Sequence, residues 1–179
     1  MLDWNVVVSV YEDGYKDALR VLEPFGRVTR TGYYNVLVMR VDDISAFIDR
    51  LAALVAETPG VLNDLSRVVP CEVCFDYESA QEFESKARDV TLSWVPELAQ
   101  SAFHVRMHRR GFKGRLSSHD EERFLDAVLL TALEEAGTPG RITFEDPDAI
   151  ISIETVGQRA GLSFWRRQDL ERYPFLRLD

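Results

Sequence analysis

The sequence predicts an α/β protein, of the α+β kind, in which two domains follow one another along the chain. The first observation is the order of patterns in residues 1–75, where β-rich runs and amphipathic helices alternate as β-α-β-β-α-β. The second is that a new series of helical stripes and alternating strands begins after this segment. The first order is that of a split βαβ, ferredoxin-like unit. We therefore expect a ferredoxin-like domain at 1–75 and a second α/β domain, with a short C-terminal tail, at 76–179.

The elements of the first domain follow from local patterns. Strands are expected where β-branched residues cluster, and helices where apolar residues recur at every third or fourth position. The expected strands are 4–10, 25–31, 34–41 and 68–75, and the expected helices are 15–22 and a second one that begins near 44 and ends at 58–60. Asp42 or Asp43 is expected to cap the second helix, and Pro70 marks the last strand as an edge strand or an interrupted one.

The second domain is expected to begin with a helix at 77–98. A second helix should start near Ser118, because Ser118–Glu121 has the pattern of a capping box. The expected strands are 103–108, 141–144, 149–156 and 161–166. In the first of these, alternation places Phe103, Val105 and Met107 on one face and His104, Arg106 and His108 on the other.

The chain is acidic overall but contains one strongly basic segment. Its formal net charge is −9, whereas residues 102–118 carry five basic side chains and no acidic one. A local field of that sign on an acidic protein indicates a confined site for an anion such as a phosphate backbone. The alternative is an edge strand and loop whose solvated charges protect against aggregation.

The sequence lacks the patterns that would predict catalysis or metal binding. Cys71 and Cys74 have C-x-x-C spacing, but they lie in an expected strand, and no second pair completes a zinc site. Residues 117–120 contain the letters of a catalytic triad, yet neighbouring residues cannot align a nucleophile, a base and an orienting carboxylate. Neither a dinucleotide-binding glycine motif nor a P-loop occurs. We therefore expect no catalytic residue, no metal and no cofactor.

The N-terminal sequence, the length of the apolar stretches and the cysteine content predict the cellular location. The N-terminus has no secretory pattern, and no apolar stretch is long enough to cross a bilayer. Two cysteines are too few for a disulfide framework. We expect a cytoplasmic protein with no membrane partner.

Three blocks of sequence occur in order in the second half. They are Phe103-x-Val105-Arg106-x-x-Arg109-Arg110-Gly111-x-Lys113, Ser117-Ser118-x-Asp120-x-Glu122-Arg123-Phe124 and Asp146-Pro147-Asp148-x-x-Ile151-x-Ile153-Glu154. Together they resemble the THUMP domain, a small RNA-binding module of tRNA-modifying proteins, including the tRNA 4-thiouridine synthetase and several tRNA methyltransferases. The similarity covers about residues 77–168. It also implies a preceding ferredoxin-like domain, which THUMP modules usually follow.

The resemblance implies that the module holds the acceptor stem and the single-stranded 3′ end of tRNA. A short THUMP protein without a catalytic domain is similar to the adaptor required for N4-acetylcytidine formation in tRNA. That similarity implies a non-catalytic protein whose partners are tRNA and a tRNA-modifying enzyme, a cytidine N4-acetyltransferase; DNA is not expected as a partner. Cations neutralise phosphates, and the free N–H groups of a helix start favour an anion. The residues expected to contact RNA are Arg106, Arg109, Arg110, Lys113, Arg115, Ser117 and Ser118.

Several alternatives stay open from the sequence. The protein can be a small redox or hydrolytic enzyme that uses Cys71 and Cys74. It can also be a protein-interaction module whose RNA binding has lapsed, with Arg109 and Arg110 left as salt-bridge partners. Single residues have structural readings as well. Arg106 can pair with Glu154 or Asp148, and Asp148 can fix a turn. Ser118 can be a helix cap, and the acids 120–122 can form a solvated face. Phe112 can stack on a base or dock on the N-terminal domain.

Overall fold

The computed structural model describes residues 2–179, and its internal contacts divide the chain into two compact units. The first unit runs to Glu72 and includes Leu170–Leu178. The second is Val73–Asp169 together with Asp179. The division thus falls between residues 72 and 73, rather than at the expected 75. The C-terminal tail was expected in the second domain, but residues 170–178 fold with the first unit.

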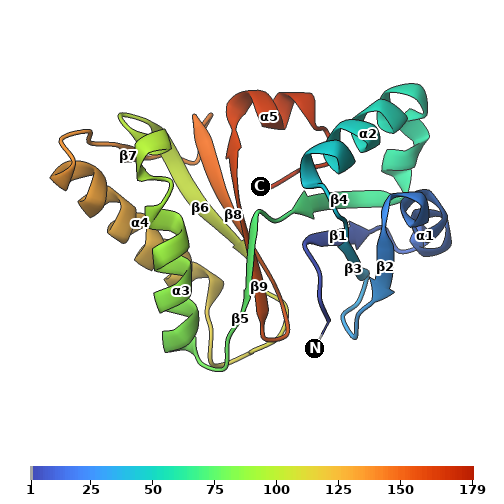
Figure 1. Ribbon diagram of the computed structural model, residues 1–179, viewed down its shortest axis with the longest axis horizontal. Coiled ribbons are helices and arrows are strands. Elements are labelled where there is room, and N and C mark those ends of the chain that lie inside the picture. Colours follow the sequence, from blue (N-terminus) through green and yellow to red (C-terminus); the bar gives the residue numbers. More distant parts are fainter. Residues whose placement is uncertain (1) are drawn as a thin grey trace. The chain divides into compact units, whose positions relative to one another are not determined.

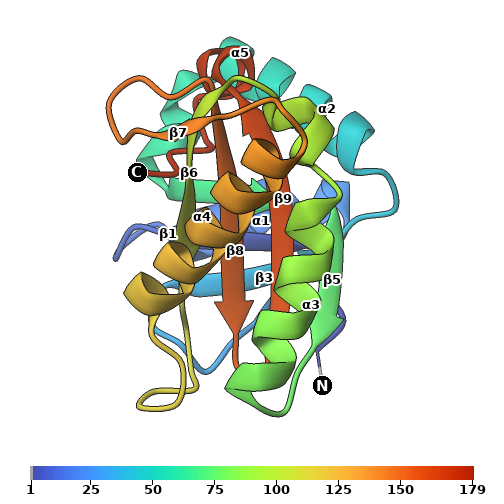
Figure 2. The ribbon, with the colours of Figure 1, turned by 90° about the vertical axis from the view of Figure 1, so that its left-hand side faces the viewer.

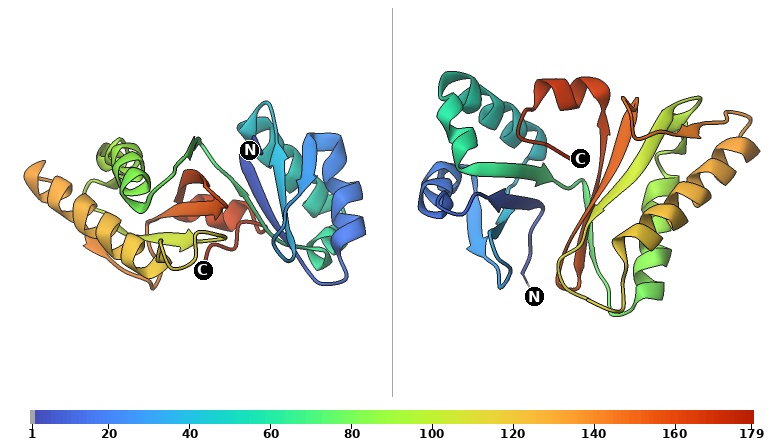
Figure 3. Two further views of the ribbon diagram at one scale, coloured as in Figure 1. Left: turned by 90° about the horizontal axis from the view of Figure 1, so that it is seen from below. Right: turned by 180° about the vertical axis from the view of Figure 1, so that it is seen from behind.

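The first unit is a four-stranded sheet with two helices. Its elements are β1 (Val6–Val10), α1 (Tyr15–Leu22), β2 (Arg27–Arg30), β3 (Val36–Arg40), α2 (Ile44–Glu57) and β4 (Leu65–Pro70), with 3-10 turns at Glu23–Phe25 and Pro59–Asn63. All strand pairs are antiparallel, and the strand order is β2-β3-β1-β4. Both helices lie on one face of the sheet (Figure 3). This is the ferredoxin-like arrangement that the element order predicts, so the fold class of the first unit is confirmed.

The α2 helix shows how local sequence sets an element. The Asp43 side chain caps it by accepting a hydrogen bond from the Ala46 N–H at 2.9 Å. Four apolar residues at helical spacing are buried, so α2 is fixed by its apolar face. They are Phe47, Ile48, Leu51 and Val55.

The strand expected at 68–75 is interrupted at Pro70, which confirms the reading of the proline. It consists of β4, which ends at Pro70 in the first sheet, and β5 (Val73–Asp76), which belongs to the sheet of the second unit. Val6 pairs with Pro70, whereas Val73 pairs with Leu162. Pro70 and Glu72 mark the interruption, but the local pattern does not reveal that the chain changes sheets there.

The C-terminal segment is part of the first unit. The Val68 N–H donates to the Phe175 carbonyl at 2.8 Å, and the Tyr173 hydroxyl donates to Asp49 Oδ1 at 2.9 Å. Tyr173, Phe175, Leu176 and Leu178 are buried. Burial and hydrogen bonding therefore hold this segment as a structural element of the unit rather than as a free tail.

The second unit is a five-stranded mixed sheet covered by two helices. Its elements are β5, α3 (Ala80–Leu92), a 3-10 turn (Val95–Leu98), β6 (Ala102–His108), α4 (Ser118–Glu135), β7 (Arg141–Ile142), β8 (Ala149–Val156) and β9 (Arg159–Arg166); α5 (Arg167–Arg172) follows. The strand order is β5-β9-β8-β6-β7, with β6 parallel to both neighbours (Figure 1). Figure 2 shows α3 and α4 lying over one face of this sheet. The helix expected at 77–98 is shorter, because α3 stops at Leu92 and the chain continues through the 3-10 turn that contains Pro96.

The core of the second unit lies between the sheet and its two helices. Phe103, Val105 and Met107 of β6 all belong to this core, which confirms the predicted alternation. The same core contains Leu125 and Leu129 of α4. Because β6 and α4 are held on both sides of the loop that joins them, the loop has fixed ends. In the described part of the chain, no helix combines the length and apolar content that a membrane crossing needs.

Candidate nucleic-acid interface

The loop between β6 and α4 is anchored by one buried aromatic residue. Phe112 is 8% exposed, and its ring packs edge-on against Tyr77 with the ring centroids 5.4 Å apart. It belongs to the core of the second unit, so the expectation that it stacks on a base or docks on the N-terminal domain is wrong. The backbone has positive φ angles at Gly111 (92°), Phe112 (56°) and Gly114 (78°). These left-handed conformations let the chain turn sharply around the buried ring.

The loop and the strand end before it carry three cations. The Arg115 guanidinium carbon stands 4.0 Å from the centre of the Phe112 ring, a cation–π contact. Arg109 Nη1 donates to the Gly111 carbonyl. Lys113, which lies between Arg109 and Arg115 in the sequence, is exposed. The anchored loop therefore presents three cations within a short stretch of chain.

The α4 helix begins directly after this loop. Ser117 is its cap, and the Ser117 Oγ accepts from the Asp120 N–H at 3.4 Å. Ser118 is the first residue of the helix, so the reading of Ser118 as the cap is wrong by one position. An 18-residue helix presents free N–H groups and the positive end of its dipole at this point.

A pocket of about 520 Å³ lies at the start of α4. Four of the expected RNA-contacting residues line it: Arg109, Arg115, Ser117 and Ser118. Its lining also contains three carboxylates that were not among the expected site residues: Glu84, Asp120 and Glu121. We call this the α4 pocket. It combines guanidinium groups with a helix start, which is an arrangement suited to a phosphate.

Arg110 is placed away from this pocket. Its side chain is 13% exposed and pairs with the fully buried Glu154, with Nη1 2.5 Å from Oε2. The Arg110 N–H donates to the Thr155 carbonyl, and the Arg110 carbonyl accepts from the Gly157 N–H. Arg110 is therefore a structural ion-pair partner that ties the end of β6 to β8.

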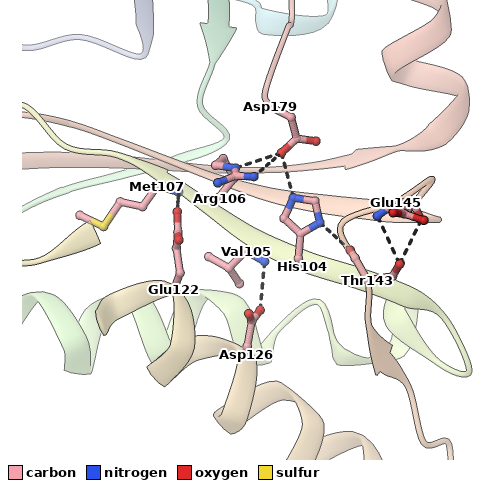
Figure 4. A network of polar contacts seen from close by, with 9 residues as sticks. All are labelled: His104, Val105, Arg106, Met107, Glu122, Asp126, Thr143, Glu145 and Asp179. Carbon is pink, nitrogen blue, oxygen red and sulfur yellow. Dashed lines mark hydrogen bonds and ion pairs between the residues drawn. The ribbon is translucent and has the colours of Figure 1, made fainter. Parts of the chain in front are cut away.

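Arg106 is also engaged in an ion pair. Its Nε and Nη2 both lie 2.9 Å from Asp179 Oδ1, rather than near Glu154 or Asp148 (Figure 4). Asp148 instead pairs with Arg167 at 3.1 Å and accepts the Ala102 N–H at 2.8 Å, in keeping with a turn-fixing role. The structure thus separates Arg106 and Arg110, which hold carboxylates, from the cations of the loop.

Carboxylates of α4 complete the edge of the sheet. The β7 strand pairs with only Ala102 and Phe103 of β6, so the following N–H groups on that edge need other acceptors. Glu122 Oε1 accepts from Met107 N–H at 2.7 Å, and Asp126 Oδ1 accepts from Val105 N–H at 3.0 Å (Figure 4). The reading of 120–122 as a solvated face therefore holds for the exposed Asp120 and is wrong for Glu121, which is buried, and for Glu122. The i, i+4 spacing of the two acids was the available sequence signal.

The electrostatics of Asp126 reflect its position. Burial raises the pKa of Asp126 to about 6, although the hydrogen bond from Val105 and the nearby His104 act to lower it. Its acceptor role does not require a charge, because a neutral carboxyl still offers an oxygen to the N–H.

The histidines and cysteines have structural positions. His104 is fully buried, with Nδ1 2.8 Å from the Thr143 carbonyl and Nε2 3.0 Å from Asp179 Oδ1. Cys71 is buried, and Cys74 is partly buried. Among residues 2–179 no group of three or more His, Cys, Asp or Glu side chains is placed to hold a metal ion.

The two units define an α+β protein that joins a ferredoxin-like unit to a THUMP-like unit. No protein-family model and no curated protein matches the sequence. Among solved structures, the chain is similar to PH1313 from Pyrococcus horikoshii Ot3 (12% identity, TM-score 0.61), covering 91% of this chain and 54% of that one. It is also similar to a 4-thiouridine synthetase in complex with RNA and ATP (14%, TM-score 0.57, covering 92% and 42%). A third similar structure is TrmN from Thermus thermophilus (18%, TM-score 0.57, covering 90% and 44%).

At these identities the similarities establish a shared fold. The chain spans about half, or less, of the length of each of these three proteins.

Proposed function

We propose that this protein binds tRNA through the second unit, with the α4 pocket and the loop before it as the contact surface. The observation that carries the proposal is the pocket's lining, in which Arg109 and Arg115 stand beside the start of α4. Lys113 is exposed on the same loop. Cations near a helix start neutralise phosphates, and this term dominates the affinity of most nucleic-acid-binding proteins.

The fold supports the choice of tRNA as the ligand. The chain shares its fold with a 4-thiouridine synthetase that was solved together with RNA. The three sequence blocks that resemble the THUMP domain include the loop and the start of α4 that build the pocket. A net charge of −9 for the whole chain would repel RNA from most other faces, so binding should be confined to this surface.

Within this proposal the protein is a non-catalytic adaptor. It holds the acceptor stem and 3′ end while a separate tRNA-modifying enzyme acts. The resemblance to the acetylation adaptor points to a cytidine N4-acetyltransferase as that enzyme.

Binding is tested with purified protein and a total tRNA pool by fluorescence anisotropy at two salt concentrations. We expect the affinity to fall with salt, with a slope that corresponds to about two to five phosphate contacts. We also expect weaker binding when the single-stranded 3′ end has been trimmed. Absence of binding at low salt would contradict the proposal.

The adaptor role is tested separately with a tRNA cytidine acetyltransferase, its acetyl donor and tRNA. We expect the protein to increase the yield of acetylated tRNA when the enzyme is limiting, and to produce none by itself. A yield that is the same with and without the protein would contradict the choice of this enzyme as the partner.

One observation favours a second candidate, a protein-interaction module without RNA affinity. Arg106 and Arg110, two of the five cations of the basic segment, are already bound to carboxylates. Three loop cations, Arg109, Lys113 and Arg115, then remain for phosphate contacts. It is distinguished by the same anisotropy measurement, in which it gives no salt-dependent binding.

A further inference from the structure

The α4 pocket contains a buried carboxyl group that the proposed RNA contacts do not use. Glu121 lines the pocket together with Arg109 and Arg115, and this residue is only 4% exposed. Within residues 2–179, no hydrogen-bond donor reaches its buried Oε2. A buried carboxylate oxygen without a donor is costly, so this group needs an explanation.

The explanation lies across the pocket on α3. Glu84 also lines the pocket, and hydrogen bonding with its carboxyl group is one of the causes that raise the pKa of Glu121. Two carboxyl groups can share such a bond only when one of them holds a proton, because an ionised carboxylate is an acceptor alone. Burial, followed by the negative charges of Glu84 and Asp120, raises the pKa of Glu121 to about 7. The pair therefore loses its proton in the neutral range.

We propose that the α4 pocket takes up an RNA phosphate together with one proton, which the Glu84–Glu121 carboxyl pair holds. The inference rests on the proposed function, because the phosphate belongs to the bound tRNA. The proton comes from solvent, and it is released again when the phosphate leaves. Glu121 is thus a determinant of affinity, although it does not itself bind the phosphate.

The charges that face Glu121 explain the coupling. Glu84 comes from α3 and Asp120 from α4, while Arg109 and Arg115 come from the strand end and the loop. Two cations and three ionised carboxyls give the lining a net charge of −1, and one proton on the pair brings it to zero. A phosphodiester, which carries one negative charge, is therefore repelled by the ionised pair and is accepted by the protonated pair.

The direction of the pH dependence follows from these charges. Below neutral pH the free protein already holds the proton, and binding is at its strongest. As the pH rises through the pKa of Glu121, binding requires proton uptake, and the affinity falls by at most about tenfold per pH unit for one proton. Bound phosphate in turn raises the pKa of Glu121 further, since the linkage is reciprocal.

The test compares wild-type protein with Glu121→Gln, measuring the dissociation constant for tRNA at about pH 6 and about pH 8, on either side of the Glu121 pKa. We expect the wild-type affinity to fall by about three- to tenfold more than that of the variant, which cannot ionise at this position. Glu134→Gln, at the far end of the same helix, is the matched control and should keep the wild-type response.

A second measurement needs no variant. Calorimetric titration of wild-type protein with tRNA at about pH 8, in two buffers that differ in ionisation enthalpy, reports the protons taken up. Uptake that approaches one proton for each bound tRNA supports the proposal. If the Glu121→Gln variant folds, this proton uptake should be absent from it. Equal pH responses in wild type and variant, or no uptake, would overturn it. Absence of RNA binding at every pH would instead overturn the proposed function, whereas binding without pH coupling leaves that function in place.

Discussion

Replacing Arg110 by alanine is expected to lower the free energy of unfolding by about 3–5 kcal/mol, because it removes a cation that pairs with a buried carboxylate. Glu154 is fully buried, and its Oε2 lies 2.5 Å from Arg110 Nη1. The neighbouring His108, whose Nδ1 is 3.3 Å from Glu154 Oε1, compensates only if it holds a proton. Chemical denaturation monitored by circular dichroism measures the loss.

Two further variants make this result specific. Arg123→Ala removes an exposed arginine of α4 and should change the stability by less than about 0.5 kcal/mol. Arg110→Met combined with Glu154→Leu removes both charges and should recover most of the loss, because the unpaired charge is the main cost. If Arg110→Ala costs no more than Arg123→Ala, the pair is not a structural element of the unit. A loss of RNA binding in an Arg110 variant would therefore report on folding, so the loop cations are the appropriate probes.

Local patterns were sufficient for most of the fold. Helix 15–22 and strand 149–156 have the predicted bounds, because each is set by its own residues and by the turn residues next to it. For the strand expected at 68–75, the pattern did not show that its two parts, β4 and β5, belong to different sheets. Whether Val73 continues from Pro70 depends on its pairing with Leu162, which lies far away in the sequence. Sheet membership is decided by such long-range partners.

The candidate site was predicted to the level of a segment, but not of single side chains. An acid-free cluster of cations on an acidic chain located the loop, since local charge composition is visible in the sequence. The roles within the cluster depend on acids that follow much later. Arg106 binds Asp179, 73 residues further on, and Arg110 binds Glu154, 44 residues further on. Glu84 and Glu121 were not predicted, because the sequence does not show that α3 and α4 bring them together.

Reversing the charges of the loop, by Lys113→Glu combined with Arg115→Glu, is expected to weaken tRNA binding by about 10- to 100-fold and to lower the salt slope by about two. Both side chains are exposed, whereas the buried Phe112 and Leu116 hold the loop on the core of the unit. The stability cost is therefore limited to the cation–π contact of Arg115, about 0.5–1 kcal/mol. Fluorescence anisotropy gives the affinity, and thermal melting verifies that the variant is folded.

A control with the same total charge decides whether the surface or the overall charge is responsible. Arg88→Glu combined with Arg123→Glu also changes the net charge by −4, on exposed positions of α3 and α4 outside the α4 pocket. Long-range repulsion acts on both double variants and is largely screened at physiological salt, whereas direct phosphate contacts are lost only in the loop variant. We therefore expect the control to weaken binding by less than about threefold. Equal losses in the two variants would mean that RNA senses the field of the whole unit, and the α4 pocket would then have no particular role.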